Sequence, residues 1–164
     1  MKRNTLLAIF MMALPMLFFT SCAPDSGNND NASARGTGAA TTGVDENYDP
    51  HRGEGKWDET NVKLDPTLNV AMAEKGKSIY DTKCTSCHKL SDERLVGPGW
   101  KGVTVRHKPY WIMNFITNPD GMLDKDPELQ EQLDICLVRM PDQNLSDDDA
   151  RNILEFMREN DGVK

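Results

Sequence analysis

Apolar residues recur at intervals of three and four in four stretches of the chain, and this period predicts four or so short amphipathic helices. The first stretch begins at Asp65, the second at Pro109, the third at Asp126 and the last at Ser146. No stretch shows the strict alternation that would predict a half-buried strand. The pattern therefore predicts an all-α fold for residues 65–164.

Local signals support these boundaries. Asp65-Pro66 and Asp126-Pro127 each place a capping side chain before a proline at the first helical position. Ser146 and Asp149 match a capping box, and Asn118-Pro119-Asp120-Gly121 predicts a turn that ends the second helix. The apolar stripe predicted for the third helix consists of Leu129, Leu133, Cys136 and Leu137.

The first 21 residues have the pattern of a bacterial signal peptide, because Lys2 and Arg3 precede an apolar run that ends on small or polar residues. The sequence Phe19-Thr20-Ser21-Cys22 resembles a lipobox, although leucine is usual where Phe19 stands. We therefore predict that Cys22 carries lipid and anchors an exported, periplasmic domain to a bacterial membrane. The alternative is that Cys22 merely ends the signal peptide. Ala23 weakly favours the outer membrane over the inner one.

Two segments separate Cys22 from the helical region. Residues 22–47 are nearly all small or polar, so they cannot bury enough apolar surface to become ordered and are predicted to be a flexible tether. Residues 48–64 contain Trp57, Val62 and Leu64, and we expect an irregular strap, called the strap below, that packs partly on the domain.

The charge balance bears on the partners. The whole chain carries 19 basic and 26 acidic residues, a formal charge of −7, and removal of Lys2 and Arg3 with the signal leaves 17 minus 26, or −9. Nucleic acid and anionic lipid surfaces are therefore disfavoured as partners. Two modes of protein docking stay open: steering by acidic residues near 120–128 and 147–149, and contact through an apolar patch.

The most informative pattern is Cys84-Thr85-Ser86-Cys87-His88, which is typical of covalent haem attachment. On one helical turn, two thiols can form thioethers with a porphyrin while the adjacent imidazole ligates the iron. A thioredoxin-like redox pair or half of a zinc site would use similar spacing. The redox pair lacks alternating strands and helices here, and the zinc site lacks two further ligands at metal spacing. We therefore predict one haem c held by Cys84, Cys87 and His88.

The remaining cysteine, Cys136, has no partner once Cys22 is assigned to lipid and Cys84 and Cys87 to haem. We expect it to be a small apolar residue on a helix face. The segment 89–108 lacks a helical period, and we predict a loop, including Pro98 and Trp100, that wraps one edge of the porphyrin.

A sixth iron ligand decides between electron transfer and catalysis. Met140 follows the third predicted helix and precedes Pro141, so its thioether can point at the iron from an extended segment. Met122 is the reserve candidate. The others are expected to be core residues, poorly placed, or solvated, and they are Met72, Met113, Met157, His51 and His107.

From about Asp65 onwards the chain resembles class I monohaem cytochromes c. The attachment motif carries most of the resemblance, and Gly97-Pro98 matches the family loop whose proline carbonyl accepts a hydrogen bond from the proximal histidine. Met140-Pro141 matches the distal ligand segment, and Gly76 and Tyr80 against Phe156 match the crossing of the first and last helices. The chain also resembles lipid-anchored cytochromes of Bacteroidota that accompany nitrous oxide reductase, through Leu90, residues 97–100, residues 111–115 and Met140.

This resemblance implies a one-electron carrier and not an enzyme. Its donor would be a quinol-oxidising complex or another cytochrome, and its acceptor a terminal reductase, such as nitrous oxide reductase, or a terminal oxidase. The rival from another class is a haem enzyme or gas sensor with a labile distal ligand. A dihaem peroxidase would need a second attachment motif, and a purely structural lipoprotein would leave the first one unexplained.

Overall fold

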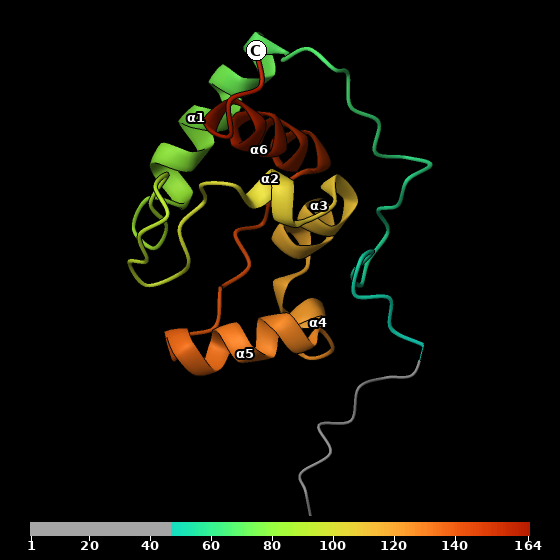
Figure 1. The fold of residues 1–164 in the computed structure, drawn as a ribbon, viewed down its shortest axis with the longest axis vertical. Coiled ribbons are helices and arrows are strands. Elements are labelled where there is room, and N and C mark those ends of the chain that lie inside the picture. Colours follow the sequence, from blue (N-terminus) through green and yellow to red (C-terminus); the bar gives the residue numbers. More distant parts are fainter. Residues whose placement is uncertain (1–46) are drawn as a thin grey trace, which may run out of the picture. The chain divides into compact units, whose positions relative to one another are not determined.

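The computed structural model describes residues 47–164, so the predicted signal peptide, Cys22 and all but the last residue of the predicted tether lie outside the described part. Within it the only β-type pairing is an isolated bridge between His88 and Arg94. The six helices of this part are α1 (Val70–Lys83), α2 (Val103–Arg106), α3 (Pro109–Thr117), α4 (Pro119–Leu123), α5 (Pro127–Cys136) and α6 (Asp147–Asn160). The all-α prediction is confirmed, and Figure 1 shows the arrangement of the helices.

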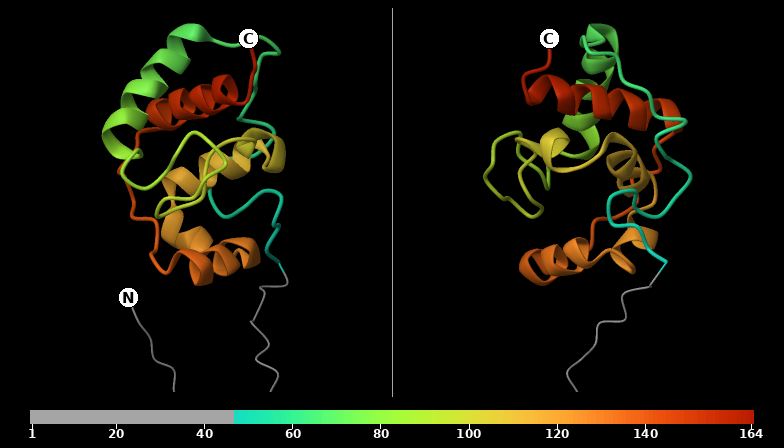
Figure 2. Two further views of the ribbon diagram at one scale, coloured as in Figure 1. Left: turned by 60° about the vertical axis from the view of Figure 1, so that its left-hand side comes forward. Right: turned by 45° about the vertical axis from the view of Figure 1, so that its right-hand side comes forward.

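The two longest helices, α1 and α6, make the most extensive helix–helix interface. Figures 1 and 2 show them crossing at one end of the domain. They approach closely at Gly76, where an added Cβ would lie 2.6 Å from the carbonyl carbon of Asn152. Beside this point the rings of Tyr80 and Phe156 are 5.5 Å apart. The predicted crossing of first and last helices is therefore present.

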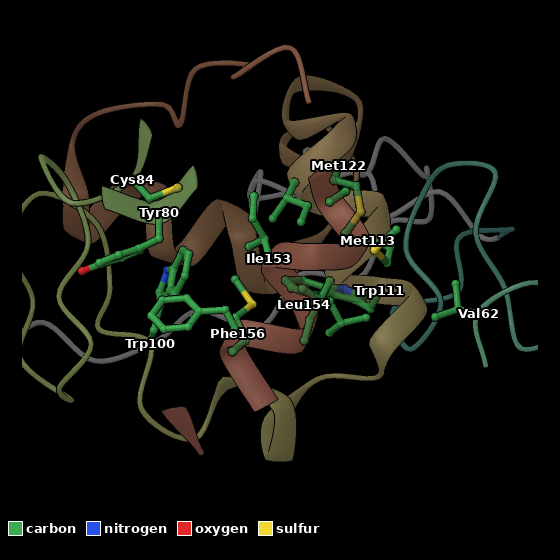
Figure 3. Close-up of a cluster of buried hydrophobic side chains, with 14 of the residues drawn as sticks. Val62, Tyr80, Cys84, Trp100, Trp111, Met113, Met122, Ile153, Leu154 and Phe156 are labelled. Atoms are coloured by element: carbon green, nitrogen blue, oxygen red, sulfur yellow. The ribbon is translucent and has the colours of Figure 1, made fainter. Parts of the chain in front are cut away.

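The core lies between α6 and α3. Ile153 and Leu154 of α6 are almost fully buried, as are Ile112 and Met113 of α3. In Figure 3 Tyr80, Trp100 and Cys84 lie on one side of the α6 residues, and Trp111, Met113 and Met122 lie on the other. One continuous apolar cluster thus joins the start of the haem motif to α3 and α4.

The first helix begins later than the sequence pattern predicts. Its N-cap is Asn69 and not Asp65, because residues 65–69 are held by α6 instead. The Asp65 carbonyl accepts a hydrogen bond from Arg158, and the Asn69 backbone N–H donates to Glu155 at 2.8 Å. Tertiary contacts to α6 therefore fix this segment outside the helix.

Two other expectations are wrong in the middle of the chain. The predicted turn after the second helix is the short helix α4, in which Pro119 takes the first position. Leu137 does not face the core, because it caps α5 in the left-handed conformation with φ 59° and is 83% exposed. The predicted caps at Asp126 and Ser146 are both present, the second as a complete capping box.

The strap runs along α3, α4 and the start of α5. Val62 is buried, and Trp57 and Leu64 pack against the core. Among residues 47–164, no helix combines the length and the hydropathy needed to cross a membrane.

Candidate haem site

The two motif cysteines lie where α1 ends. Cys84 is the C-cap residue, its N–H donating to Tyr80 O at 2.9 Å, and the His88 N–H donates to Cys84 O at 2.9 Å. This tight turn brings Cys84, Cys87 and His88 together. Burial raises the pKa of the Cys84 thiol to about 11, so this sulfur is held as a thiol at neutral pH, while Cys87 is half-buried.

The His88 ring is fixed by its own loop. Its Nδ1 lies 2.8 Å from the Pro98 carbonyl oxygen, which can only accept, so Nδ1 carries the proton and Nε2 keeps a free lone pair. Burial lowers the pKa of His88, and the Pro98 hydrogen bond opposes that shift. Gly97 lies against the imidazole, since a Cβ there would be 2.9 Å from Nδ1. The ring is thus oriented as a neutral ligand.

Trp100 and Tyr80 pack near His88 and hold it in place. The Tyr80 hydroxyl donates to the His88 carbonyl at 2.7 Å, and its ring lies 4.8 Å from the buried ring of Trp100. The Trp100 ring is in turn 5.8 Å from that of His88. Trp100 also lines two of the cavities described next.

Three adjoining cavities surround the motif, and His88 and Met140 line all three. The three cavities also share Cys87, Pro98, Trp100, Phe115 or Ile116 in pairs, so their walls adjoin. The wall of the first is overwhelmingly apolar, with Phe115 from α3 and Leu129 and Leu133 from α5. The structure therefore brings the predicted proximal and distal ligands to one apolar space.

The Met140 segment is held at both sides. Arg139 forms ion pairs with Asp120 and Asp124 at 3.2 and 2.9 Å, which ties the segment to α4 and its C-cap. Beyond Met140, the Lys83 ammonium donates to the Gln143 carbonyl at 2.8 Å. Met140 therefore lies on a short non-helical segment that is held on both sides.

The reserve candidate Met122 is placed differently. It is fully buried, packs beneath Gly53, and contributes to none of the three cavities that contain His88. Met113 and Met157 are buried core residues as expected, although Met157 also lines the second cavity. Met72 is half-buried on α1, and His51 is exposed. Of the methionines outside the core in residues 47–164, Met140 is the one that lines the cavities around the haem motif.

His107 departs from its expected solvated position. Its side chain is only 14% exposed, stacks on Trp111 at 3.9 Å, and lies 3.6 Å from a carboxylate oxygen of Glu128. Burial lowers its pKa, against the opposing effect of Glu128. It lines the second cavity together with His88 and Met140. The spacing of four between His107 and Trp111 was the only sequence signal for this stack.

Cys136 is also closer to the site than predicted. It is the last residue of α5, is half-buried, and lines the first cavity with Cys87 and His88. It thus belongs to the cavity wall as well as to the helix face.

These residues fit a covalently held haem. Two nearby thiols match two thioether bonds, and an imidazole with a free Nε2 and a thioether match two protein ligands of a haem iron. A side chain at position 97 would press on this imidazole, so the glycine leaves the ring in place. An all-helical domain with this donor set around an apolar cavity is a c-type haem domain.

The family model described as Cytochrome c matches residues 73–161, just over half of the chain, and the chain belongs to this family. A cytochrome c from Rhodothermus marinus is 36% identical, with a TM-score of 0.60, and the match covers 63% of this chain and 89% of that one. The engineered Rhodothermus marinus cytochrome c Rma TDE is also 36% identical over 63% of this chain and 90% of its own, with a TM-score of 0.59. No curated protein matches the chain.

Family membership establishes a single covalent haem c and the role of an electron carrier. The cytochrome c fold predicted from the sequence is therefore confirmed, with six helices in the described part instead of about four.

Proposed function

We propose that this chain is a lipid-anchored, periplasmic one-electron carrier that takes electrons from a quinol-oxidising complex or another cytochrome and delivers them to a terminal reductase. The observation that carries the proposal is the convergence of His88 and Met140 on the same cavities. If the His88 imidazole and the Met140 thioether both held a haem iron, outer-sphere electron exchange would be the function that fits.

Each group of the site has a part in this function. Haem c, when bound, supplies an iron that alternates between the ferric and ferrous states. The Pro98 carbonyl keeps the proton on His88 Nδ1, so that Nε2 is the ligating atom. The soft Met140 sulfur favours the ferrous state, and the apolar walls limit the access of water.

The ligation is tested by replacing each methionine with a residue of similar volume. Met140→Leu should abolish the near-infrared band that ferric histidine–methionine ligation produces and should lower the reduction potential. Met122→Leu is the matched control, because Met122 is buried outside the three cavities and should keep the band. A band that survives Met140→Leu and disappears in Met122→Leu would reverse the assignment. A wild-type protein without the band would favour a haem enzyme or sensor with a labile ligand.

An exposed apolar surface next to the first cavity suggests how the carrier docks. We call it the haem-edge patch, and it consists of Leu95, Val96, Ile135, Leu137 and Val138. Arg94 joins its two segments by donating to the Ile135 carbonyl at 3.3 Å, and Val96 and Val138 line the cavity itself. Exposed aliphatic side chains at the mouth of a redox site suit the small, short-lived contacts of electron transfer.

Part of the predicted acidic face is not available for steering. Asp126 is 1% exposed and accepts internal hydrogen bonds, which corrects its placement on the surface. Asp120 and Asp124 are paired with Arg139. These observations favour the haem-edge patch over the acidic residues near 120–128 as the docking surface, so the partner should present an apolar patch of its own.

Nitrous oxide reductase is the first acceptor to test, because of the resemblance of residues 97–100 and 111–115 noted from the sequence, and a terminal oxidase is the alternative. Stopped-flow mixing of the reduced carrier with each oxidised enzyme measures electron delivery directly. Failure to reduce nitrous oxide reductase at any salt concentration would remove that partner while leaving the carrier function intact.

Membrane attachment is a separate proposal that rests on Cys22 following the apolar run. Cys22→Ser should release the chain into the soluble fraction or leave the signal uncut, as seen by fractionation and mass spectrometry. Unchanged mass and unchanged membrane association would argue against lipidation.

A further inference from the structure

The helix α5 forms much of the haem-cavity wall yet has few attachments of its own. Leu129, Gln132 and Leu133 line the first cavity, but α4 is the only helix of the described part with which α5 packs substantially. Figures 1 and 2 show α4 and α5 on the other side of α3 from α6. The position of this wall must therefore be set by something other than packing on the α1–α6 pair.

The strap supplies one fastening through Asn114 of α3, a fully buried side chain whose hydrogen bonds all go to the strap. Its Oδ1 accepts from the Trp57 N–H at 2.9 Å, and its Nδ2 donates to the carbonyls of Arg52 and Trp57 at 3.0 and 2.9 Å. Gly55 lies directly on this carboxamide with φ +152°, and an added Cβ would be 2.9 Å from Asn114 Cγ. Backbone atoms of the strap thus bind Asn114 of α3, and there is no room for a side chain at position 55.

A second fastening is made at the start of α5. The Tyr48 hydroxyl donates to Asp126 Oδ2 at 2.6 Å, and the Trp111 indole N–H donates to the same oxygen at 3.0 Å. The other oxygen of Asp126 accepts from the N–H groups of Glu128 and Leu129 and so caps α5. One buried carboxylate therefore joins the strap, α3 and the first turn of α5.

The contacts that the strap makes with α3 and α5 lead along the chain to Met140 and do not involve His88. α5 ends at its left-handed cap, Leu137, and three residues later comes Met140, whose neighbour Arg139 is paired with Asp120 and Asp124 of the α4 region. His88 is held by Pro98 and Tyr80, neither of which contacts the strap through a hydrogen bond. The strap also lies outside residues 73–161, the part that the family model matches.

We propose that the strap is a positioning element for the distal ligand: through Asn114 and Asp126 it holds the α4–α5 wall, and through that wall it keeps the Met140 thioether at the iron. The inference rests on the proposed ligation by Met140. Loosening the strap should therefore weaken the methionine ligand and leave covalent haem attachment and the His88 ligand unchanged.

The test uses the full-length, haem-loaded chain and two variants with the same kind of backbone change. Gly55→Ala puts a methyl group into Asn114 and unfastens the strap. Gly162→Ala is the matched control, because Gly162 also has positive φ, +95°, but has no atom within 4 Å of an added Cβ. The readouts are the near-infrared histidine–methionine band of the ferric protein, its affinity for added imidazole, and the mass of the chain with haem attached.

Each hydrogen bond is worth a factor of roughly 2 to 10 in an equilibrium constant, so loss of the three at Asn114 should tighten imidazole binding by at least about tenfold. We expect this in Gly55→Ala with a weakened band and an unchanged mass, and wild-type behaviour in Gly162→Ala. Trypsin cleavage after Arg52 or Lys56 reports whether the strap has detached. A detached strap with wild-type band and imidazole affinity would overturn the proposal, and so would equal effects in both variants.

A milder variant tests the positioning role of the strap if the Gly55→Ala protein does not accumulate in cells. Tyr48→Phe removes only the hydroxyl bonded to Asp126 and should raise imidazole affinity by a factor of roughly 2 to 10. Unchanged affinity in Tyr48→Phe would then refute the positioning role. Met140→Leu separates the two proposals, because a band that persists in Met140→Leu refutes the ligation itself and not the attachment of the wall.

Discussion

Glu155 offers the sharpest test of how the α1–α6 pair is held. It is a fully buried carboxylate on α6 that accepts hydrogen bonds from the Asn69 N–H at 2.8 Å, from Arg151 at 2.7 Å and from Arg158 at 2.6 Å. Arg158 is itself nearly buried, with 8% of its side chain exposed. Glu155→Gln keeps the shape of the side chain and removes the charge that these donors share.

The cost can be worked out from these contacts. A hydrogen bond to a charged group contributes about 1.5–3 kcal/mol and one between neutral groups about 0.5–1.5 kcal/mol, so three bonds lose about 3 kcal/mol in total. The same figure follows from the 3–5 kcal/mol lost when one partner of a buried ion pair is removed. For a domain of about 100 residues this corresponds to a fall in Tm of roughly 10–20 °C.

The assay is urea unfolding of the haem-loaded protein followed by circular dichroism, with Glu159→Gln on the exposed side of α6 as the control. Burial acts to raise the pKa of Glu155, but the hydrogen bonds from Asn69, Arg151 and Arg158 outweigh it and the pKa is lowered. A lowered carboxyl pKa stabilises the fold above the unfolded value of 4.5, and the stabilisation is lost as pH falls through the folded value. The difference in free energy of unfolding between wild type and Glu155→Gln should therefore be largest at pH 7 and should decrease below about pH 4.5.

The explanation is wrong if Glu155→Gln lowers the free energy of unfolding no more than Glu159→Gln does at pH 7. If the difference in free energy of unfolding stayed constant down to pH 3, the packing of the Glu155 side chain and not its charge would stabilise these contacts.

Three further outcomes are expected. Gly97→Ala pushes on the imidazole and weakens the His88–Pro98 hydrogen bond, which makes His88 a poorer donor and should raise the reduction potential by tens of millivolts in a redox titration. Gly76→Ala forces α1 and α6 apart and should cost about 1–3 kcal/mol in urea unfolding, whereas Gly162→Ala should cost less. The rate of electron delivery to the acceptor should be nearly independent of salt concentration. It should fall several-fold in Val138→Lys but not in Val105→Lys, whose side chain is also exposed but lies outside the haem-edge patch. A steep fall with salt in the wild type would restore acidic steering.

The sequence predicted the helices whose ends are decided locally. Asp126 and Ser146 cap α5 and α6 because a side-chain oxygen needs only backbone N–H groups two or three residues away. The hydrogen bond between His88 and Pro98 was implied by the family resemblance and is present at 2.8 Å. These features depend on short-range chemistry or on a motif specific enough to identify the family.

The sequence-based predictions are wrong where one pattern is typical of two structures, or where residues distant in the sequence determine the local conformation. Asn-Pro-Asp-Gly at 118–121 is typical of a turn, but proline at the first position and an acidic residue in the first turn are also typical of a helix start, and α4 forms. Asp65-Pro66 has a good capping pattern, yet Glu155 and Arg158 of α6 bind residues 65–69 in a non-helical form. His107 lies outside α3 in an extended conformation, so its spacing of four from Trp111 was too weak a signal to predict that the two rings stack.

Most contacts that hold the two ligand segments are made by different residues, although Lys83 on the Met140 side directly precedes Cys84. Pro98, Gly97 and Tyr80 act on His88, whereas Arg139 and Lys83 act on either side of Met140. Substitutions that alter the distal half can accumulate without disturbing the half that attaches the cofactor. A lineage can therefore shift the redox potential by drift or selection in α4, α5 and the strap, while the maturation machinery continues to meet an unchanged attachment site.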